Sequence, residues 1–576
     1  MLDLTIRGGT VVDGTGAVPR RADVGVRHGR VVVVGEVEEP ARATIEADGL
    51  LVTPGFVDLH THYDAQLFWD PTASPSPLHG VTTVLGGNCG FSLAPAGPEH
   101  AGYLARMMAR VEGMPLEVLS RLDWDWTSFG DWLGRLEGGV GVNAGFLVGH
   151  STLRRAVMGE SAVGTEASPD QVGAMMALLH RCLEEGALGL STSQAQTHHD
   201  GEGEPVPSRS AGRGELEALC AAVGRHPGTT LEGIVPGCIN GFSPEEVELL
   251  GTLSLRADRP LNWNVLGVSS FNPEGTARQL AASDAAAARG ATVVALTLPH
   301  TMVLRLSFES GAILDGLPGW GPIFGLPREE RLRALADPEV RRRLDEGARS
   351  PEAGILGALA RWEHLIFEET FTPETAGAEG RTVGAVAAER GVDPFDAMLD
   401  VVGADGLRTG LKPPIPEFEE DWAARARVWE DPRAVVGGSD AGAHLDVMCG
   451  AVYSTAMLGE GGRKRGLLSW ESAVHQLTDV PARLYGLVDR GRVAEGYWAD
   501  LVLLDPDRVG PGPVRTRADL PGGSSRLSAE AEGVEHVLVN GVELVRGGRF
   551  TGERPGTVLR SGRDTRTVTA AGARSR

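Results

Sequence analysis

The sequence predicts an α/β protein: a (β/α)8 barrel of the TIM type, a small β-sandwich formed by the N- and C-terminal segments, and an insert between barrel strands 7 and 8. Short apolar runs alternate with helical stretches rich in Ala, Leu, Glu and Arg through the middle of the chain, which is typical of parallel α/β domains. Eight such runs favour a closed barrel over an open sheet. Both ends of the chain instead alternate and turn like small antiparallel sheets.

The β-sandwich is expected from residues 1–50 together with residues 493–550. Residues 4–13 and 23–35 have the short strands and glycine turns of hairpins, and residues 500–545 have the same texture. Two β-rich ends that flank a long αβ middle suggest that the ends meet in one sandwich. Periodicity by itself leaves that pairing open.

The barrel is expected over residues 51–492. Active sites of such barrels lie at the carboxyl ends of the strands. The predicted strands are 51–60, 81–87, 143–149, 187–192, 230–235, 261–267, 292–298 and 434–438. Residues with metal-binding or acid–base side chains at or just after these ends are His60, His62, Cys89, His150 and Asp440.

Three stretches depart from a plain barrel. Residues 91–141, after the second strand, carry extra helix and the aromatic run Trp124-Asp-Trp126. The stretch at about 303–430 is too long for a loop and predicts an insert or lid, with an amphipathic helix over 328–349. The tail, 552–576, is rich in Gly, Arg, Thr and Ser and is expected to be disordered.

Composition limits the partners of this chain. Its 576 residues carry 54 basic and 77 acidic side chains, a net charge of −23, which argues against a nucleic-acid or anionic-membrane binder. No apolar run reaches the ~18 residues of a membrane span, and the N-terminus reads as a strand rather than a leader. Five scattered cysteines suggest the reducing cytoplasm. A small-molecule substrate is expected, and the oligomeric state is left open.

His60 and His62 are the first candidate metal ligands. Alternate side chains of a strand point to the same face, so both imidazoles project together at the barrel mouth and can share a divalent ion. An isolated His-x-His pair is a weak signal. Here it closes an apolar run that follows a β-rich N-terminal module, and this context favours a metal site.

Five segments carry a family resemblance. Residues 54–64, PGFVDLHTHYD, resemble the first-strand motif of the amidohydrolase superfamily, whose paired histidines bind metal. Residues 80–92, GVTTVLGGNCGFS, are similar to the second-strand motif of the N-acyl-D-amino-acid deacylases, in which the cysteine is a metal ligand. Residues 149–159, 186–192 and 437–444 resemble the same family, and the resemblance spans nearly the whole chain, as a divergent member.

The resemblance implies roles for Cys89 and Asp440. Cys89 would bind the metal as a thiolate, since a cation lowers the pKa of a thiol. Asp440 would contact the metal and shuttle a proton from the attacking water to the leaving nitrogen, because a metal-bound water has a pKa near ~7. Nitrogen and sulfur ligands favour Zn²⁺, with iron or manganese as alternatives.

The two lysines of the chain decide against a lysine-bridged metal pair. Binuclear members of the superfamily often bridge two ions with a carboxylated lysine on strand four. Neither Lys412 nor Lys464 falls near the predicted fourth strand. A single ion is therefore expected.

Strands five and six depart from the deacylase pattern, which has a histidine ligand on each. Here Glu232 is a candidate oxygen ligand, and Asn262 or Asn264 is a weaker one. For substrate binding, His150 and Arg209 are the candidates, with Arg154 as an alternative for an α-carboxylate. The remaining histidines near strand ends, His198, His199 and His300, are interpreted as loop residues, and His444 has no role that spacing fixes.

Three functions follow. The first is metal-dependent hydrolysis of a linear amide, the deacylation of N-acyl-D-amino acids or related N-acyl compounds. The second is hydrolysis of another C–N bond, in a cyclic amide, imide or ureide, on the same scaffold. The third is a non-catalytic barrel with weakened metal binding, motivated by the histidines that strands five and six lack.

Overall fold

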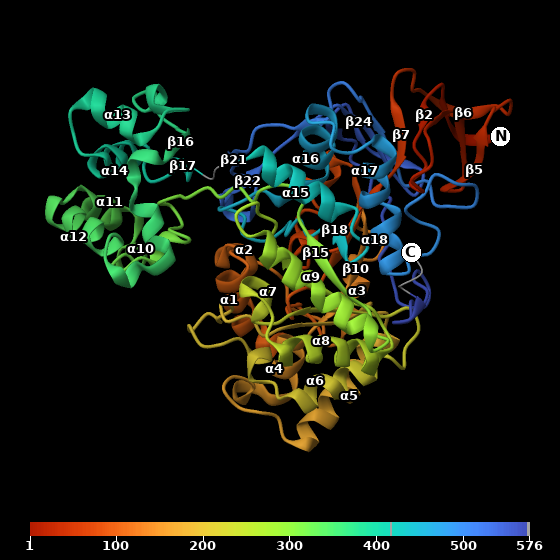
Figure 1. Cartoon of the computed structure of the whole chain (residues 1–576), viewed down its shortest axis with the longest axis horizontal. Coiled ribbons are helices and arrows are strands. Elements are labelled where there is room, and N and C mark those ends of the chain that lie inside the picture. The colour runs from red at the N-terminus through yellow and green to blue at the C-terminus, as the bar shows by residue number, and fades with distance from the viewer. Residues whose placement is uncertain (415–416, 573–576) are drawn as a thin grey trace.

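All eight predicted barrel strands are present in the computed structural model, which describes residues 1–414 and 417–572 (Figure 1). Neighbouring strands pair in parallel around the barrel. The His62 N–H donates to the Ala441 carbonyl (2.7 Å), which joins the first strand to the last and closes the ring. The strands are β8 (Phe56–Asp58), β9 (Val81–Gly86), β10 (Asn143–Phe146) continued by β11 (Val148–Gly149), β12 (Gly189–Ser193), β13 (Thr230–Ile234), β14 (Leu261–Leu266), β15 (Val293–Thr297) and β18 (Ala434–Val436).

Helices cover the outside of the barrel. Two of them begin with a capping box and a proline in the first turn, Ser168 with Gln171 and Ser243 with Glu246, which satisfies the free N–H groups of the helix start. Among the described residues, no helix combines the length and hydropathy that a bilayer span requires. The helices are α4 (His150–Met158), α5 (Pro169–Glu184), α6 (Arg213–Val223), α8 (Pro244–Ala257), α9 (Pro273–Ala288), α15 (Glu419–Trp429), α17 (Trp470–Leu477) and α18 (Asp479–Leu484).

The two ends of the chain build one sandwich. Its first sheet has the order β5-β4-β1-β6 and its second the order β26-β25-β24-β19-β7-β2-β3, so N-terminal and C-terminal strands share the second sheet. Apolar residues of both ends fill the space between the sheets. The strands are β1 (Leu2–Arg7), β2 (Thr10–Val11), β3 (Arg20–Arg21), β4 (Asp23–Arg27), β5 (Arg30–Gly35), β6 (Ala41–Glu46), β7 (Leu51–Pro54), β19 (Leu501–Leu504), β24 (Val534–Val539), β25 (Val542–Arg546) and β26 (Arg549–Phe550).

The predicted first barrel strand, 51–60, is two strands. β7 belongs to the sandwich, where it pairs with β2 and β19, and only β8 belongs to the barrel. The break falls at Gly55, where a Cβ would lie 2.1 Å from the Thr82 Oγ1 atom. An apolar run is continuous in the sequence, but close packing against β9 bends it here.

Residues 510–532 leave the sandwich and reach the barrel mouth. They form the short strands β20 (Gly510–Pro511), β21 (Arg515–Arg517), β22 (Arg526–Ser528) and β23 (Ala531–Glu532). The Leu527 N–H donates to the Leu445 carbonyl (2.6 Å), which ties this excursion to the loop after β18. The prediction that the whole of 493–550 belongs to the sandwich is therefore wrong for this stretch.

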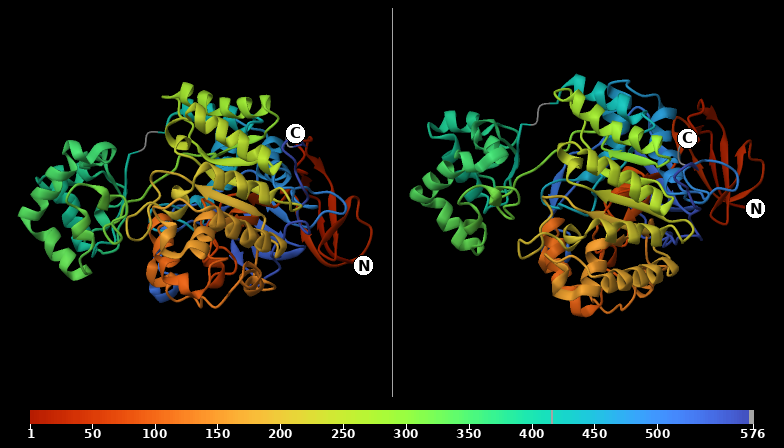
Figure 2. Two further views of the ribbon diagram at one scale, coloured as in Figure 1. Left: turned by 90° about the horizontal axis from the view of Figure 1, so that it is seen from below. Right: turned by 60° about the horizontal axis from the view of Figure 1, so that its bottom comes forward.

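The insert after β15 is a lobe with its own apolar core (Figure 1). It lies at the opposite end of the molecule from the N-terminal strands, and Figure 2 shows the same separation from two other directions. Its helices and strands are α10 (Gly321–Phe324), α11 (Arg328–Ala336), α12 (Pro338–Ala348), β16 (Ile366–Glu369), α13 (Val383–Arg390), α14 (Pro394–Ala404) and β17 (Gly410–Lys412).

Two details of the insert differ from the prediction. The helix expected over 328–349 is two helices, because Asp337 caps the second one and Pro338 occupies its first position. The C-terminal limit near residue 430 is too far along, because Trp422, Val428 and Trp429 of α15 belong to the core of the barrel.

A helical lobe follows β9, as the extra length of 91–141 predicts. It consists of α1 (Ala101–Val111), α2 (Leu116–Leu119) and α3 (Phe129–Leu136). The buried face of α1 includes Leu104, Met107 and Met108, which join the main core. This lobe is anchored against the barrel on the same side as the strand ends.

The tail is ordered as far as residue 572, contrary to the disorder expected for 552–576; the last four residues lie outside the described part. Val558 and Leu559 are fully buried. The Leu559 N–H donates to the Ala144 carbonyl (2.8 Å), and the Arg566 N–H donates to the Gly486 carbonyl (2.7 Å). Polar composition suggested disorder, but the few apolar residues of this segment fit the base of the barrel.

Candidate metal centre

His60, His62 and Cys89 converge at the barrel mouth, as the sequence predicts. The two histidines follow β8, and the cysteine follows β9. The Cys89 Sγ atom lies 3.2 Å from His60 Nε2 and 3.9 Å from His62 Nε2. All three side chains are buried, and their donor atoms lie within 4.8 Å of one another.

A strained loop turns Cys89 back toward the histidines. Gly87, Cys89 and Gly90 all have positive φ angles, and a Cβ on Gly87 would lie 2.1 Å from the Leu147 carbonyl oxygen. The Asn88 side-chain amide donates to the Leu85 carbonyl (2.8 Å) and to the Thr61 carbonyl (3.2 Å). Such strain at a non-glycine residue is concentrated at functional sites.

Asp440 lies on the opposite side of the histidine pair, also in a left-handed conformation (φ 58°). Its Oδ1 atom is 3.0 Å from His62 Nε2 and 3.6 Å from His60 Nε2, while its Oδ2 atom is 3.7 Å from His444 Nε2. The side chain is 25% exposed, in contrast to the buried histidines. Asp440 therefore stands between the histidine pair and solvent.

Glu112 is a member of the centre that the sequence-based prediction missed. Its Oε2 atom lies 3.4 Å from His62 Nε2, and the side chain is 3% exposed. Glu112, His62 and Asp440 form a second group of donors within 4.8 Å of one another. One signal was present in the sequence: a carboxylate directly after an apolar helix opposes the negative end of the helix dipole.

Glu232 is placed beside the centre, with both oxygens in hydrogen bonds. Its Oε2 accepts from the Cys89 N–H (3.0 Å) and its Oε1 from the Asn264 side-chain amide (2.6 Å). The Asn262 Oδ1 atom accepts from the Tyr485 hydroxyl (3.0 Å). The groups of His, Cys, Asp and Glu donors found among the described residues do not include Glu232. Glu232 thus supports the Cys89 loop, and its role as a metal ligand stays a prediction.

The structure places His150 and Arg154 in a buried network, and the substrate roles suggested for them stay predictions. His150 is fully buried, and its ring nitrogens contact Thr192 Oγ1 (2.9 Å) and Glu215 Oε1 (2.8 Å). Arg154 is fully buried and donates to Glu215 Oε2 (2.5 Å). Both bind the Glu215 carboxylate.

Arg209, the other suggested substrate ligand, braces the loop after β12. Its Nη1 atom donates to the carbonyls of Gln196 (3.2 Å) and His198 (3.1 Å). The Nδ1 atom of His198 contacts Ser193 Oγ (2.8 Å). Burial lowers the pKa of His198 to about 4, and the charges of Asp440 and His62 act on it, so its ring lies near the centre. This histidine was interpreted as a plain loop residue.

The buried acidic groups of the centre would be stabilised by a bound cation. Burial lowers the pKa of His60 to about 3 and raises that of the Cys89 thiol well above its ordinary value. Burial also lowers the pKa of His62, but the carboxylates of Glu112 and Asp440 outweigh it and bring the pKa to about 9. A cation between these groups would stabilise the thiolate and both carboxylates at once.

The spacing of the donors fits a small divalent ion. Ligand bonds of about 2.0–2.3 Å in a tetrahedral zinc site place the donor atoms roughly 3.3–3.8 Å apart. The separations around His62 Nε2 are 3.0 Å to Asp440, 3.4 Å to Glu112 and 3.9 Å to Cys89. Nitrogen, sulfur and carboxylate donors, in two groups that share His62, are the chemistry that zinc prefers.

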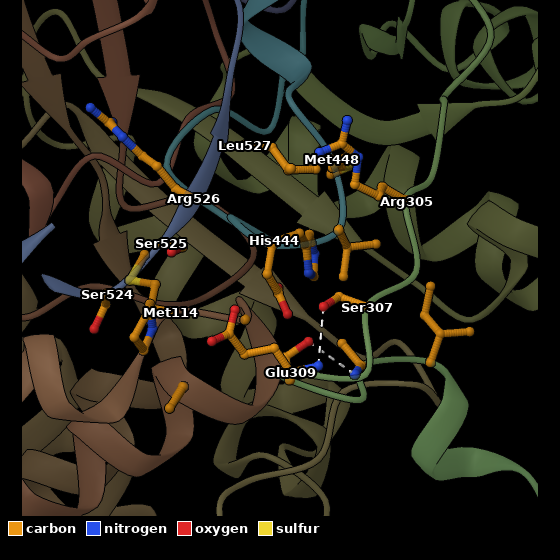
Figure 3. A pocket seen from close by; sticks show the side chains of 18 of the residues that line it. Met114, Arg305, Ser307, Glu309, His444, Met448, Ser524, Ser525, Arg526 and Leu527 are labelled. Atoms are coloured by element: carbon orange, nitrogen blue, oxygen red, sulfur yellow. Dashed lines mark hydrogen bonds between the residues drawn. The ribbon is translucent and has the colours of Figure 1, made fainter. Parts of the chain in front are cut away.

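A pocket of about 860 Å³ opens onto this centre. Asp440 and His444 line it from the loop after β18. Figure 3 shows Met114 from the helical lobe, Ser307 and Glu309 from the insert, and residues 524–527 from the C-terminal excursion on its other sides. Thr197 and His199 of the loop after β12 also line it, so segments that are distant in the sequence enclose the space above Asp440.

Comparisons with known proteins agree with this site. A model of the amidohydrolase family matches residues 43–545. The N-acyl-D-aspartate deacylase of Alcaligenes xylosoxydans xylosoxydans is 30% identical to the chain, over 97% of this chain and 95% of that protein. The D-aminoacylase of the same organism is 28% identical, over 97% of both proteins.

Solved structures give the same result. The N-acyl-D-glutamate deacylase of Bordetella bronchiseptica, complexed with zinc and a phosphonate mimic of the tetrahedral intermediate, has a TM-score of 0.64 at 26% identity and covers 97% of this chain and 100% of that one. A D-aminoacylase with a binuclear metal centre, in which one metal activates and the second attenuates, has a TM-score of 0.63 at 27% identity with the same coverage. The chain therefore belongs to the amidohydrolase family.

Proposed function

We propose that this amidohydrolase deacylates N-acyl-D-amino acids or related N-acyl compounds, with Asp440 as the proton shuttle. The observation that carries the proposal is the placement of Asp440, whose Oδ1 contacts the His60–His62 pair and whose Oδ2 faces His444 and the pocket. Curated relatives that match 97% of the chain at about 30% identity are N-acyl-D-aspartate and N-acyl-D-glutamate deacylases.

His60, His62, Cys89 and Asp440 would hold one divalent ion, which we propose is Zn²⁺. When bound, such an ion supplies a water with a pKa near ~7 and a positive charge for the substrate carbonyl oxygen. A lysine-bridged pair finds no support, because Lys412 lies in β17 of the insert and Lys464 lies at the end of a helical stretch after β18. The five unpaired cysteines fit the cytoplasm as the compartment.

Asp440 would carry both proton transfers of the reaction, with His444 beside it. Asp440 takes the proton of the attacking water on its Oδ2 side and returns it to the amine nitrogen as the C–N bond breaks. His444, 3.7 Å away, is placed to stabilise the charged carboxylate. The helical lobe, the insert and the C-terminal excursion enclose the pocket and limit access of bulk water.

The test combines metal analysis with a substrate panel. Purified protein is analysed for bound metals, and zinc-loaded protein is then assayed with N-acetyl-D-amino acids, their L enantiomers and a hydantoin. Release of acetate from D substrates, lost with a chelator and restored by zinc, supports the proposal. Ring opening of the hydantoin alone would favour the cyclic C–N bond. Less than about one-tenth of an equivalent of metal, with no product, would favour a non-catalytic barrel.

A further inference from the structure

We propose that Glu112 is a ligand of the metal: a carboxylate delivered to the centre by the helical lobe after β9, outside the barrel strands. This inference rests on the proposed function, because it assumes that the centre binds a divalent ion. It assigns to one residue the role of linking the lobe to the catalytic site.

Glu112 is a buried carboxylate without a permanent cation. The side chain is 3% exposed, and among the described residues its one ion-pair partner within 4.0 Å is His62, at 3.4 Å. An arginine pairs with some other buried carboxylates of this protein, as Arg154 does with Glu215 and Arg490 with Asp500. Buried charges persist when they are paired or bind a metal. Among the described residues no arginine pairs with Glu112, so a bound metal would be the cation that satisfies its charge.

The backbone holds Glu112 in place from two sides. Its N–H donates to the Met108 carbonyl (2.9 Å) as the C-cap of α1. Its own carbonyl accepts from the His444 N–H (2.5 Å). Gly113 follows with a φ of 60°, and a Cβ there would lie 3.1 Å from the His444 Cα atom. The carboxylate is thus fixed between α1 and the loop that carries Asp440, as a preorganised ligand requires.

Glu112 lies at the negative end of the α1 helix dipole, where a bound cation would turn an unfavourable interaction into a favourable one. The C-terminus of α1 carries partial negative charge, so a carboxylate there is disfavoured. A divalent ion between Glu112 and Asp440 would interact favourably with both carboxylates and with the helix end. The two carboxylates and the helix end repel one another in the absence of metal, and all three attract a bound cation.

His62 connects the two donor groups. Its Nε2 atom belongs both to the group with His60 and Cys89 and to the group with Glu112 and Asp440. One imidazole nitrogen binds one ion, so an ion on His62 can draw on the thiolate side and on the carboxylate side. Glu112 supplies this ion with a negative oxygen donor from the side away from Cys89. Glu232, on the Cys89 side, keeps its hydrogen bonds to Cys89 and Asn264.

The experiment measures metal binding, not turnover. Zinc affinity is measured by competition with a chromogenic chelator for the wild type, E112Q, E232Q and the exposed control E99Q. We expect the dissociation constant of E112Q to rise at least ~10-fold, and that of E99Q to equal the wild type. In the cobalt-loaded proteins, E112Q should change the ligand-field absorption while the thiolate charge-transfer band of Cys89 remains.

Each outcome decides between the two proposals. A wild type that binds no zinc overturns the proposed function and this inference with it. An E112Q protein that binds zinc as tightly as the wild type, with an unchanged cobalt spectrum, overturns this inference alone, and so does a loss of binding in E232Q but not in E112Q. If E112Q does not fold, E112D keeps the charge but withdraws the carboxylate, and a wild-type cobalt spectrum and affinity for E112D would overturn the inference.

Discussion

At the scale of single residues, Asp440 is distinguished from the other donors by its exposure. We expect D440N to lower kcat by about 10²- to 10⁴-fold, because the amide cannot accept the proton of the attacking water. His60, His62 and Cys89 remain, so most of the metal should be retained. Metal analysis and steady-state kinetics on one preparation check this. A loss of activity that only follows a loss of metal would make Asp440 a ligand and not a proton shuttle.

Two buried acids beside the centre, Glu232 and Asp58, which accepts from the His60 N–H, also predict a pH dependence of the stability of the metal-free enzyme. Burial raises the pKa of Asp58 to about 7 and that of Glu232 to about 8. The fold thus favours their protonated forms, and the stability they contribute is full below their ordinary pKa near 4 and is lost as the pH rises to about 8. His62, whose pKa is raised to about 9, acts in the same direction. His60, whose pKa is lowered from 6.5 to about 3, acts in the opposite direction between those two values and so contributes little between pH 6 and pH 9.

The metal-free enzyme should therefore melt several degrees lower at pH 9 than at pH 6. E232Q should reduce this difference, because it removes one of the buried groups that ionise in this range. Differential scanning fluorimetry of chelator-treated protein at matched ionic strength measures both. A melting temperature that is equal at the two pH values, or higher at pH 9, contradicts the assignment.

At the scale of elements, the end of α1 couples the helical lobe to the metal centre. In G113A, the new Cβ meets the His444 Cα atom at 3.1 Å and the backbone keeps a left-handed φ, so Glu112 and His444 should shift. We expect a loss of zinc affinity of about 10-fold and a comparable loss of activity. Gly138, in the same lobe, has a φ of 69° and no atom within 4 Å of the position that a Cβ would occupy, so G138A is the matched control for backbone strain alone.

The elements were largely predictable, with exceptions that have local causes. Capping residues and apolar periodicity place the barrel strands and most helices. The helix expected over 328–349 breaks because Pro338 cannot continue the preceding turn. The run 51–60 divides because Gly55 packs directly on Thr82. β7 pairs with β2 and β19, and neither of these strands is next to it in the sequence, so local patterns do not predict the pairing.

At the scale of the whole molecule, the charges of the pocket predict substrate preference. Arg305 is bound by Glu368 (2.8 Å) and Glu369 (2.6 Å), and Arg526 is bound by Asp519 (2.8 Å). Glu309 and Asp446 also line the pocket, and neither forms an ion pair with another described residue. Arg408 lines the pocket too and donates to the Asp405 carbonyl, but acidic side chains in and next to the lining outnumber the basic ones. A second carboxylate on the substrate would therefore meet net negative charge.

N-acetyl-D-amino acids with neutral or basic side chains should accordingly exceed N-acetyl-D-aspartate in kcat/KM by about 10-fold or more, since like charges in a binding site are strongly disfavoured. Parallel assays at one ionic strength measure the ratio. E309Q, which removes one of these charges, should narrow it. A preference for the acidic substrates, with no change in E309Q, would show that the pocket arginines are available to substrate.

The tail joins the barrel instead of extending into solvent. A chain that ends at Thr551 loses Val558 and Leu559, each fully buried and worth about 1.5–3 kcal/mol, together with backbone hydrogen bonds to β10. We expect the truncated protein to melt several degrees lower or to be insoluble. L559A, measured in the full chain, should show part of the effect. An unchanged melting temperature after truncation would contradict a structural role for the tail.

The sequence by itself determined the barrel, the sandwich ends, the insert and the convergence of His60, His62, Cys89 and Asp440, because strand period and strand order bring these ends together. Only the tertiary structure decided the rest. Glu112 reaches His62 through a lobe whose docking depends on long-range packing. Likewise, Glu232 and His150 have the right chemistry for a site, but the hydrogen bonds that occupy them come from residues distant in the chain. Local periodicity predicts the face to which a side chain points, but it does not predict which distant residue forms a hydrogen bond with that side chain.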